Sequence, residues 1–333
     1  MKVLFLFRNN LAGYSIHTVF RTLLAGMYGK VEADEVFMPS FRAQARDIIR
    51  NGIYSHKHER KGWINHITGD VHYLLYFLKG KRTVVTVHDI MYYHYLKGVK
   101  RVIWKWLYIR PLKRAAKVVF ISDFSRRQVL QEIVLPEERL AVIPNPVCPD
   151  FTYTPKEFNA AKPRILHIGT LERKNLCRTV KALQGIPCHL RIIGDLDEEI
   201  SDLLRGAEVE YSSACNLTHE EILAEYRKAD VINFPSLYEG FGMPVIEGQA
   251  TGRVVVTSDL SPMKEVAGGG AVLVDPYSVG SLREAYQRVI SEPETRDAVI
   301  VKGLANVRKY QVGKIVEKYI GIYQEITEER NVD

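Results

Sequence analysis

A buried strand passes directly into a helix through a glycine-containing turn in the second half of the chain. Residues Asp230–Phe234 form a short apolar run typical of a buried strand, and Met243–Ala250 show the pattern of a helix. Between them, Gly240 and Gly242 allow the backbone to turn tightly and to approach a ligand. The first amides of the helix have no partner within it, so this junction predicts a site for a phosphate.

Two glutamates flank this turn in the sequence Pro-Ser-Leu-Tyr-Glu-Gly-Phe-Gly-Met-Pro-Val-Ile-Glu, residues 235–247. Glu239 lies in the loop, where it offers only acceptors at neutral pH, and hydroxyl groups are natural partners for it. Glu247 lies one helical turn beyond Pro244, still close to the helix N-terminus. The segment therefore predicts a site for an anion and a sugar.

The same unit of apolar strand, loop and helix recurs along the chain. In the first half the predicted strands are Lys2–Phe7, Glu35–Met38, Thr83–Val87, Lys117–Ile121 and Leu140–Ile143, and the predicted helices are Ser15–Met27, Val102–Arg114 and Ser125–Ile133. In the second half the predicted strands are Arg164–Ile168, His189–Ile193, Asp230–Phe234, Arg253–Thr257 and Ala271–Val274. This alternation predicts an α/β fold with parallel sheets covered by helices on both faces.

A polar, proline-containing segment, Pro149–Pro163, separates the two series of strands and predicts a linker. At 333 residues the chain is long enough for two domains. We expect two doubly wound, Rossmann-like domains, residues 1–155 and 156–311, that face each other across a cleft. Ligands of such domains bind outside the carboxyl ends of the strands.

Three loops that follow strands of the second half carry the polar residues expected of a ligand site. They are Gly169–Asn175, Gly194–Asp197 and the Glu239–Glu247 segment. In the first of these loops, Arg173 and Lys174 stand just before a helix, where both are suited to bind a diphosphate. Arginine can contact two phosphate oxygens at once, and lysine acts as a point charge.

The Pro-Ser-x-x-Glu-Gly-Phe-Gly-x-Pro-x-x-Glu pattern resembles the signature of the retaining GT-B glycosyltransferases of family 4, which use nucleotide-sugar donors. The resemblance extends over roughly residues 83–323. Further segments match in register, and these are Val118–Arg126, Val142–Pro146, Tyr226–Asp230, Ser261–Val266, Val274–Pro276 and Gly313–Gln324. The resemblance implies an acceptor-side first domain, a nucleotide-sugar-binding second domain and a last helix, in residues 312–333, that crosses back to the first domain.

The resemblance also implies roles for single residues. Glu239 would bind hydroxyls of the donor sugar, Glu247 would hold the ribose, and Arg173 and Lys174 would contact the donor diphosphate. Amides for the sugar and phosphate would come from Gly240, Phe241, Gly242 and Met243.

Three further candidates come from the loops that follow the first strands of each half. His88, after the strand Thr83–Val87, resembles the family's histidine near the acceptor and the reacting carbon, although a histidine at a strand end is as often structural. Thr170 belongs to the loop of Arg173 and is a candidate donor contact, at a position where many members have arginine. Gly13 is a single glycine in a first loop where members commonly have a pair.

Metal ions and cofactors are not expected at this site. Asp195 and Asp197 form an Asp-x-Asp pair that could hold a divalent ion beside a diphosphate, but enzymes resembling this one neutralise the leaving group with cationic side chains and helix amides. We expect no cofactor beside the nucleotide-diphosphate sugar. The four cysteines lack short paired spacings, which favours reduced thiols over disulfides or zinc.

Positive charge is concentrated in the first half. Residues 1–150 contain 24 Lys and Arg against 12 Asp and Glu, a net charge of +12, whereas residues 151–333 contain 22 against 27, a net charge of −5. The stretch Lys97–Lys117 combines basic residues with Trp104, Trp106 and Tyr108. Such a stretch fits either an anionic membrane surface or a packed helix with a solvated basic face. No nucleic acid partner is expected.

No apolar run reaches the roughly 18 residues of a membrane span, and the apolar N-terminal run breaks at Arg8. We therefore expect a cytoplasmic enzyme, with peripheral membrane association if the basic stretch contacts lipid. The expected reaction is retaining, metal-independent transfer of a hexose to a hydroxyl of a glycan or lipid-linked acceptor in cell-surface polysaccharide or glycolipid synthesis. The alternatives are a non-catalytic nucleotide-sugar-binding module of the same fold and a Rossmann-type oxidoreductase, against which the first strand is followed by no Gly-x-Gly-x-x-Gly.

Overall fold

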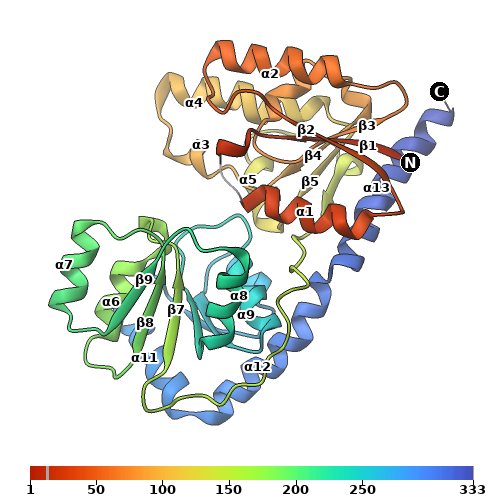
Figure 1. Cartoon of the computed structure of the whole chain (residues 1–333). Helices are drawn as coiled ribbons and strands as arrows, with labels where there is room; N and C mark the ends of the chain where they lie inside the picture. Colours follow the sequence, from red (N-terminus) through yellow and green to blue (C-terminus); the bar gives the residue numbers. More distant parts are fainter. Residues whose placement is uncertain (13–14, 333) are drawn as a thin grey trace. The chain divides into compact units, whose positions relative to one another are not determined.

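The computed structural model describes residues 1–12 and 15–332 (Figure 1). The chain divides into two compact units, and each has its own sheet and core. The first unit comprises Met1–Pro146 and Val312–Asp333, and the second comprises Val147–Gln311. The division falls after Pro146, and residues 147–155 lie in the second unit.

The first unit contains a six-stranded parallel sheet in the order β2-β1-β3-β4-β5-β6. Its strands are β1 (Lys2–Phe7), β2 (Glu32–Phe37), β3 (Ile64–Ile67), β4 (Thr83–Val87), β5 (Lys117–Phe120) and β6 (Leu140–Val142). Its helices are α1 (Ser15–Met27), α2 (Ala45–His58), α3 (Met91–Tyr95), α4 (Gly98–Trp104), α5 (Asp123–Leu130) and α13 (Val312–Val332). The edge strand β2 begins at Glu32 rather than at the predicted Glu35. The prediction missed its first residues because they lack the large apolar side chains that mark a buried strand.

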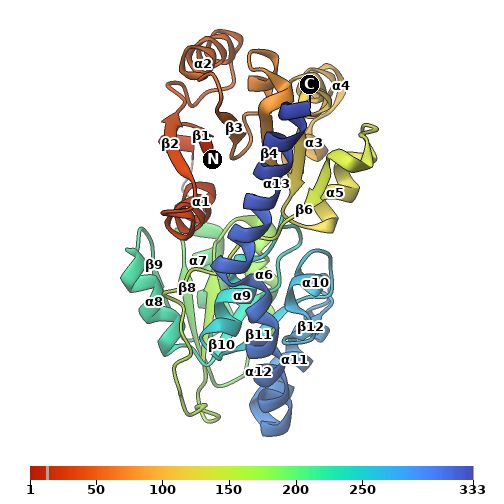
Figure 2. The ribbon, with the colours of Figure 1, turned by 90° about the vertical axis from the view of Figure 1, so that its right-hand side faces the viewer.

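The alternating side chains of β1 explain why this sheet is covered on both faces. Leu4 and Leu6 enter the main apolar core of the unit, while the Phe5 ring packs edge-on against Tyr323 of α13. Helix α13 lies beside α1 against this second face (Figure 2). The two helices approach closely because α1 has Gly26 there, where a Cβ atom would stand only 2.5 Å from Val312.

The predicted single helix Val102–Arg114 is wrong as one regular element. Helix α4 ends at Trp104, residues Lys105–Ile109 form a π-helical turn, and residues Arg110–Arg114 form a 3₁₀ turn. Pro111 gives the physical reason, since it has no N–H to donate within the helix and its ring crowds the preceding turn.

The second unit contains another six-stranded parallel sheet, in the order β12-β11-β10-β7-β8-β9. Its strands are β7 (Arg164–Ile168), β8 (His189–Ile193), β9 (Tyr211–Ala214), β10 (Val231–Phe234), β11 (Val254–Ser258) and β12 (Val272–Val274). Its helices are α6 (Leu176–Leu183), α7 (Glu198–Gly206), α8 (His219–Lys228), α9 (Met243–Ala250), α10 (Met263–Ala267), α11 (Val279–Ser291) and α12 (Pro293–Val307). The two parallel sheets confirm the predicted α/β fold class.

The strand order of the second sheet predicts where ligands bind. The chain runs outward from β7 through β8 to β9, and then returns to β10 on the other side of β7. Loops leaving the carboxyl ends of β7 and β10 therefore diverge to opposite sides of the sheet, and ligands bind between such loops. The loop after β7 contains Arg173 and Lys174, and the loop after β10 contains Glu239.

Within the parts of the chain that the structure describes, no helix is long and apolar enough to cross a bilayer.

Candidate functional site

Three charged side chains of the second unit meet where β7 and β10 end. Arg173 Nη1 lies 2.6 Å and Lys174 Nζ lies 2.7 Å from the same oxygen, Oε1, of Glu239. The three side chains are only 13–25% exposed, and the Arg173 guanidinium also contacts the carbonyl of Tyr238. The sequence predicted these residues separately, as diphosphate and sugar contacts, and the structure brings all three together. We call them the Glu239 cluster.

Asn175 fixes the backbone beneath this cluster. It is buried in a left-handed conformation with φ of 68°, and its side-chain amide donates to the carbonyls of Pro235 (3.0 Å) and Pro276 (2.7 Å). The Leu237 amide donates to the carbonyl of Arg173 at 2.7 Å. These bonds join the loops after β7, β10 and β12. The sequence analysis assigned Asn175 to this loop but did not predict its positioning role. That role could have been inferred because asparagine tolerates positive φ better than most residues.

Lys174 is held close to apolar surface. Its ammonium lies 4.5 Å from the centre of the Phe234 ring, and burial lowers its pKa, while the Glu239 carboxylate acts in the opposite direction. Gly169, with φ of 91°, makes room for the lysine stem, since a Cβ atom there would stand 2.9 Å from Lys174 Cγ. The predicted donor contact Thr170 packs against the neighbouring loop, where a Cβ on Gly194 would approach it to 2.8 Å.

The predicted amide donors, residues 240–243, directly follow Glu239 in the sequence and form the turn into α9. Gly242 adopts a φ of 109° that favours glycine, and it directly precedes the helix, where Met243 and a proline form the first turn. The side chain of Phe241 is buried and packs edge-on against Tyr310 at 5.7 Å. The Phe241 ring is therefore part of the core, and Phe241 and Gly240 offer the site only backbone groups.

Glu247 lies on α9 and accepts a hydrogen bond from the hydroxyl of Tyr226 on α8. Burial raises the pKa of Glu247 to about 7, against the opposing effects of this hydrogen bond and of the charges of His219 and Lys174. The carboxyl group is therefore partly protonated near neutral pH. Tyr226 is a positioning residue that the sequence reading did not single out.

His88 and Gly13 belong to the first unit. His88 Nε2 donates to the carbonyl of Thr68 at 2.9 Å, and burial lowers its pKa to about 4. The ring is therefore neutral at pH 7 with its proton on Nε2, which leaves Nδ1 as an acceptor for a hydroxyl group. Ser125 holds the backbone of His88 through a 2.7 Å hydrogen bond. Gly13 lies outside the described residues.

The potential metal ligands that lie close together in space are not the Asp195 and Asp197 pair considered from the sequence. Asp197 of the Asp-x-Asp pair caps α7 by accepting from the Ile200 amide at 2.8 Å. In the described part of the chain, the group of three potential ligands that come together is Cys148, Asp150 and His219. The sequence analysis did not predict this group, because Cys148 and His219 lie far apart in the chain.

Two family models match the chain. The model described as Glycosyl transferases group 1 matches residues 153–304, and the model described as Glycosyltransferase Family 4 matches residues 22–151.

Relatives of similar sequence are also glycosyltransferases by name. O-antigen chain mannosyltransferase B of Escherichia coli is 26% identical over 271 residues, which cover 73% of this chain and 70% of that protein. O-antigen chain mannosyltransferase RfbU of Salmonella typhimurium is 26% identical over 224 residues, which cover 64% of this chain and 62% of that protein.

Solved structures share the fold at low sequence identity. A sucrose-phosphate synthase from Thermosynechococcus elongatus has a TM-score of 0.81 at 16% identity, covering 99% of this chain and 100% of that one. WaaG, a glycosyltransferase involved in lipopolysaccharide biosynthesis, has a TM-score of 0.72 at 14% identity, covering 97% and 99%. The chain belongs to the family 4, group 1 glycosyltransferases and has their GT-B fold.

Proposed function

We propose that this enzyme transfers a hexose from a nucleotide-diphosphate sugar, with retention of configuration, to a hydroxyl of a glycan or lipid-linked acceptor in cell-surface polysaccharide or glycolipid synthesis. The observation that carries the proposal is the Glu239 cluster, in which two cations share one carboxylate oxygen at the carboxyl ends of β7 and β10. The cluster has one excess positive charge, and the N-terminal end of α9 adds a partial one. Such a site favours a diphosphate and stabilises the charge that develops on it as a leaving group.

Donor binding redistributes the bonds of this cluster. A diphosphate offers Arg173 and Lys174 stronger partners than one shared carboxylate oxygen. Glu239 then has lone pairs available for the hydroxyls of the donor sugar. Glu247, one turn into α9, accepts from the ribose hydroxyls once it is ionised.

A front-face transfer fits these residues better than a double displacement. Retaining glycosidases use a carboxylate nucleophile and a second carboxyl group roughly 5 Å away. Here Glu247 is hydrogen-bonded to Tyr226, and Glu239 accepts from the hydroxyls of the donor sugar once the diphosphate has taken the two cations, so neither carboxylate is assigned to attack. We infer that the departing diphosphate accepts the acceptor's proton as the new glycosidic bond forms on the same face.

The chemistry needs no metal ion or redox cofactor in this proposal, since side-chain cations and helix amides neutralise the leaving group. For the sugar, several relatives are named mannosyltransferases, and an Anabaena relative in structure was solved with UDP and glucose. Mannose is therefore the first hexose to test, with glucose second.

The deciding experiment is a donor screen followed by product analysis. Thermal-shift measurements against GDP-, UDP-, ADP- and dTDP-sugars identify the donor, and NMR of the product reports the anomeric configuration. Retention supports the proposal, whereas inversion overturns the front-face step. Binding of a donor without transfer or hydrolysis in the presence of cell-derived acceptors would favour the non-catalytic binding module instead.

We also propose that α4 of the first unit binds an anionic membrane surface. Val99, Val102, Ile103 and Trp106 follow the spacing of one helical face, and each is at least half exposed. The other side packs inward, where Trp104 stacks on Tyr108 at 4.7 Å. This arrangement favours a lipid contact over a solvated basic face, because a solvated face has no need of exposed apolar side chains.

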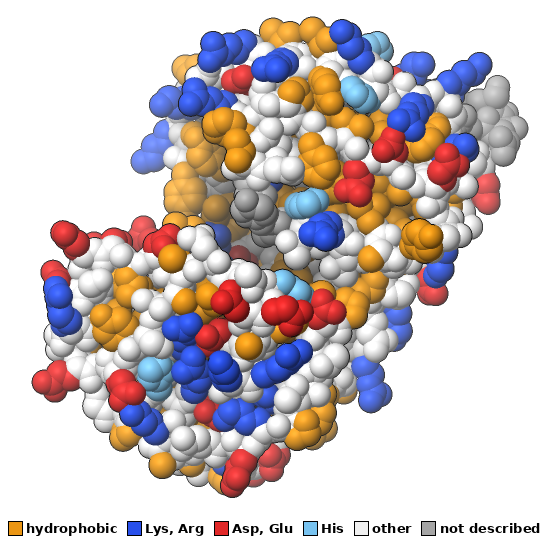
Figure 3. Space-filling view, viewed as in Figure 1, with side chains coloured by type: hydrophobic (Ala, Val, Ile, Leu, Met, Phe, Trp, Pro, Cys, Tyr) orange, Lys and Arg blue, Asp and Glu red, His pale blue; other side chains and the backbone are white. Residues whose placement is uncertain are grey.

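Basic residues border this apolar stripe. In Figure 3, Lys and Arg side chains gather with hydrophobic ones at the edge of the first unit where α3 and α4 lie. A cavity of about 450 Å³ beside Trp106 is lined by Lys105, Arg110 and Lys113. Glu132 pairs with Lys105 at 2.7 Å, and in the described residues Arg110 and Lys113 have no carboxylate partner. The Arg110 guanidinium lies 3.6 Å from the centre of the Trp106 ring, and together with Lys113 it suits the phosphate of a lipid headgroup.

A further inference from the structure

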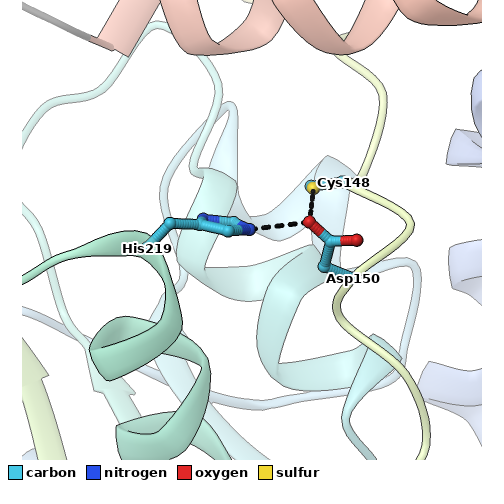
Figure 4. A group of neighbouring side chains, drawn as sticks. All are labelled: Cys148, Asp150 and His219. Atoms are coloured by element: carbon cyan, nitrogen blue, oxygen red, sulfur yellow. Dashed lines mark hydrogen bonds and ion pairs between the residues drawn. The ribbon is translucent and has the colours of Figure 1, made fainter.

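A thiol, a carboxylate and an imidazole converge at the start of the second unit, outside the Glu239 cluster. The Cys148 thiol donates to Asp150 Oδ2 at 3.4 Å, and His219 Nε2 lies 2.8 Å from the same oxygen (Figure 4). The three ligand atoms all lie within 4.8 Å of one another. Neither the proposed transfer reaction nor the packing of the core uses these groups.

The distances are close to those of a tetrahedral zinc site. With zinc–sulfur bonds of about 2.3 Å and zinc–nitrogen or zinc–oxygen bonds of about 2.0 Å, tetrahedral angles put sulfur about 3.5 Å from oxygen and oxygen about 3.3 Å from nitrogen. The observed sulfur–oxygen and oxygen–nitrogen separations are 3.4 and 2.8 Å, and the sulfur–nitrogen separation, which is at most 4.8 Å, has to reach about 3.5 Å for the three atoms to share one ion. A Cys–Asp–His set is borderline-soft and selects zinc over magnesium or calcium, which prefer oxygen ligands.

The backbone already positions these ligands. Val147 donates to the carbonyl of Tyr310 at 2.9 Å, which anchors the chain just before Cys148, and Phe151 donates to the carbonyl of Cys148 at 3.1 Å, which closes a turn that contains Asp150. His219 is the first residue of α8, whose N-terminus is closed by a capping box between Thr218 and Glu221. A site built on anchored backbone loses little entropy when it binds an ion.

Two of the three side chains are open to solvent. The side chains of Asp150 and His219 are 57% and 44% exposed, which gives an ion direct access and leaves a fourth position for water.

We propose that Cys148, Asp150 and His219 form a binding site for Zn²⁺ that fastens the first residues of the second unit to α8. His219 and Asp150 are 69 positions apart, so the ion closes a long loop. The Phe151 ring contacts both the His219 ring and the Tyr226 ring, at 6.3 and 4.9 Å. The ion therefore stabilises the helix from which Tyr226 reaches Glu247, without contacting the reacting groups.

The test uses the full-length protein, stripped with chelator under reducing conditions and free of sugar nucleotide. Zn²⁺ binding is measured by competition with a chromophoric chelator, and Co²⁺ is added as a spectroscopic probe of thiolate ligation. We expect one equivalent of Zn²⁺ and a thiolate-to-cobalt charge-transfer band. Removing a residue that only hydrogen-bonds to a metal ligand lowers metal affinity about 10–100-fold. Removing a ligand itself, in Cys148→Ser or His219→Ala, should lower the affinity for Zn²⁺ by at least that much.

Matched controls come from the same unit. Cys177 and Cys215 are exposed thiols, and His189 pairs with Glu210 at 3.0 Å outside the Cys148–Asp150–His219 group, so Cys177→Ser, Cys215→Ser and His189→Ala should bind normally. Saturating Zn²⁺ should raise Tm in the wild type and in these controls but not in Cys148→Ser, because an ion that binds only the folded state stabilises it.

The proposal is overturned if the wild type binds no Zn²⁺ at micromolar levels, or if Cys148→Ser keeps the charge-transfer band. It is equally overturned if the controls lose binding as fully as Cys148→Ser and His219→Ala do. Circular dichroism of each variant verifies that it is folded. Since no donor is present, the outcome is independent of the proposed transferase reaction.

Discussion

Lys174 Nζ lies 2.7 Å from Glu239 Oε1, although the two residues are 65 positions apart in the chain. The same oxygen also accepts from Arg173, so its one negative charge is shared between two cations. This sharing holds the two cations side by side. In the proposed mechanism, a diphosphate therefore has to replace only one carboxylate oxygen to bind both.

Replacing Lys174 with alanine tests its role in stabilising the leaving group. We expect kcat at saturating donor to fall by roughly 100-fold or more, because a buried cation that faces the leaving diphosphate contributes a few kcal/mol to transition-state stabilisation. Lys181→Ala, an exposed lysine on the following helix, is the control and should keep its turnover. Wild-type turnover in Lys174→Ala would remove Lys174 from the proposed mechanism.

The sequence predicted strands whose residues are mostly apolar. The bounds of β1, β4, β7 and β8 agree with prediction, whereas β3 and β9 were missed. The β3 sequence is Ile-Asn-His-Ile, and its His66 is buried because it hydrogen-bonds to Tyr323 and Thr86. Those partners lie far along the chain, so local polarity alone indicated a loop.

The sequence could predict the part of the site that depends on where the strands end. Arg173 and Glu239 follow strands of one sheet, and parallel strands bring such loops together. Their shared oxygen, the Tyr226 hydrogen bond to Glu247 and the approach of His219 to Cys148 depend on side-chain positions that no local pattern encodes.

The raised pKa of Glu247 predicts a pH dependence of donor use. Its pKa of about 7 is above the usual carboxyl value, so a proton occupies the group as pH falls through 7 and removes its capacity as a pure acceptor. We expect kcat/KM for the donor to rise between about pH 6 and 8, with a midpoint near pH 7, and to level off above. Glu247→Gln should give a low, flat profile, while Glu199→Gln, an exposed carboxylate on α7, should behave as the wild type.

Tyr226→Phe gives a second measurement on the same group. The Tyr226 hydrogen bond lowers the pKa of Glu247, so its removal should move the midpoint of the profile to higher pH. A midpoint that does not move, with donor affinity unchanged, would assign the pH dependence to another group.

Excess EDTA tests the metal-independent part of the proposal. Turnover should persist, because the cations that face the diphosphate are side chains. The zinc site proposed at Cys148 includes no residue of the Glu239 cluster, so chelation should lower Tm and leave kcat unchanged. Loss of turnover that Mn²⁺ or Mg²⁺ restores would instead make Asp195 and Asp197 candidate ligands.

Gly248 predicts a packing limit behind the site. A Cβ atom there would stand 2.8 Å from Ile232 and 2.9 Å from Val255, so α9 rests directly on β10 and β11. Gly248→Ala should destabilise the fold by about 1–3 kcal/mol, seen as a lower Tm. Gly206→Ala, where an added Cβ meets nothing within 4 Å, is the control. A Tm equal to that of the wild type would show that α9 can move away without cost.

The apolar and basic surface around α4 predicts binding to anionic bilayers. Vesicle co-sedimentation should increase with the fraction of anionic lipid and decrease with salt, because charges are screened over roughly 10 Å at 0.1 M. Each basic residue near such a surface contributes about 1 kcal/mol, so neutralising Lys105, Arg110, Lys113 and Arg114 together should weaken binding by at least about 100-fold.

Trp106→Ser separates the apolar contribution from the electrostatic one. This side chain is 50% exposed, and its loss should weaken binding to neutral and anionic vesicles alike, whereas the quadruple variant should lose only the anionic preference. Donor hydrolysis should stay at the wild-type level in both variants, because the Glu239 cluster belongs to the second unit. Co-sedimentation that neither salt nor either variant changes would show that this surface is solvated and that the acceptor reaches the enzyme from solution.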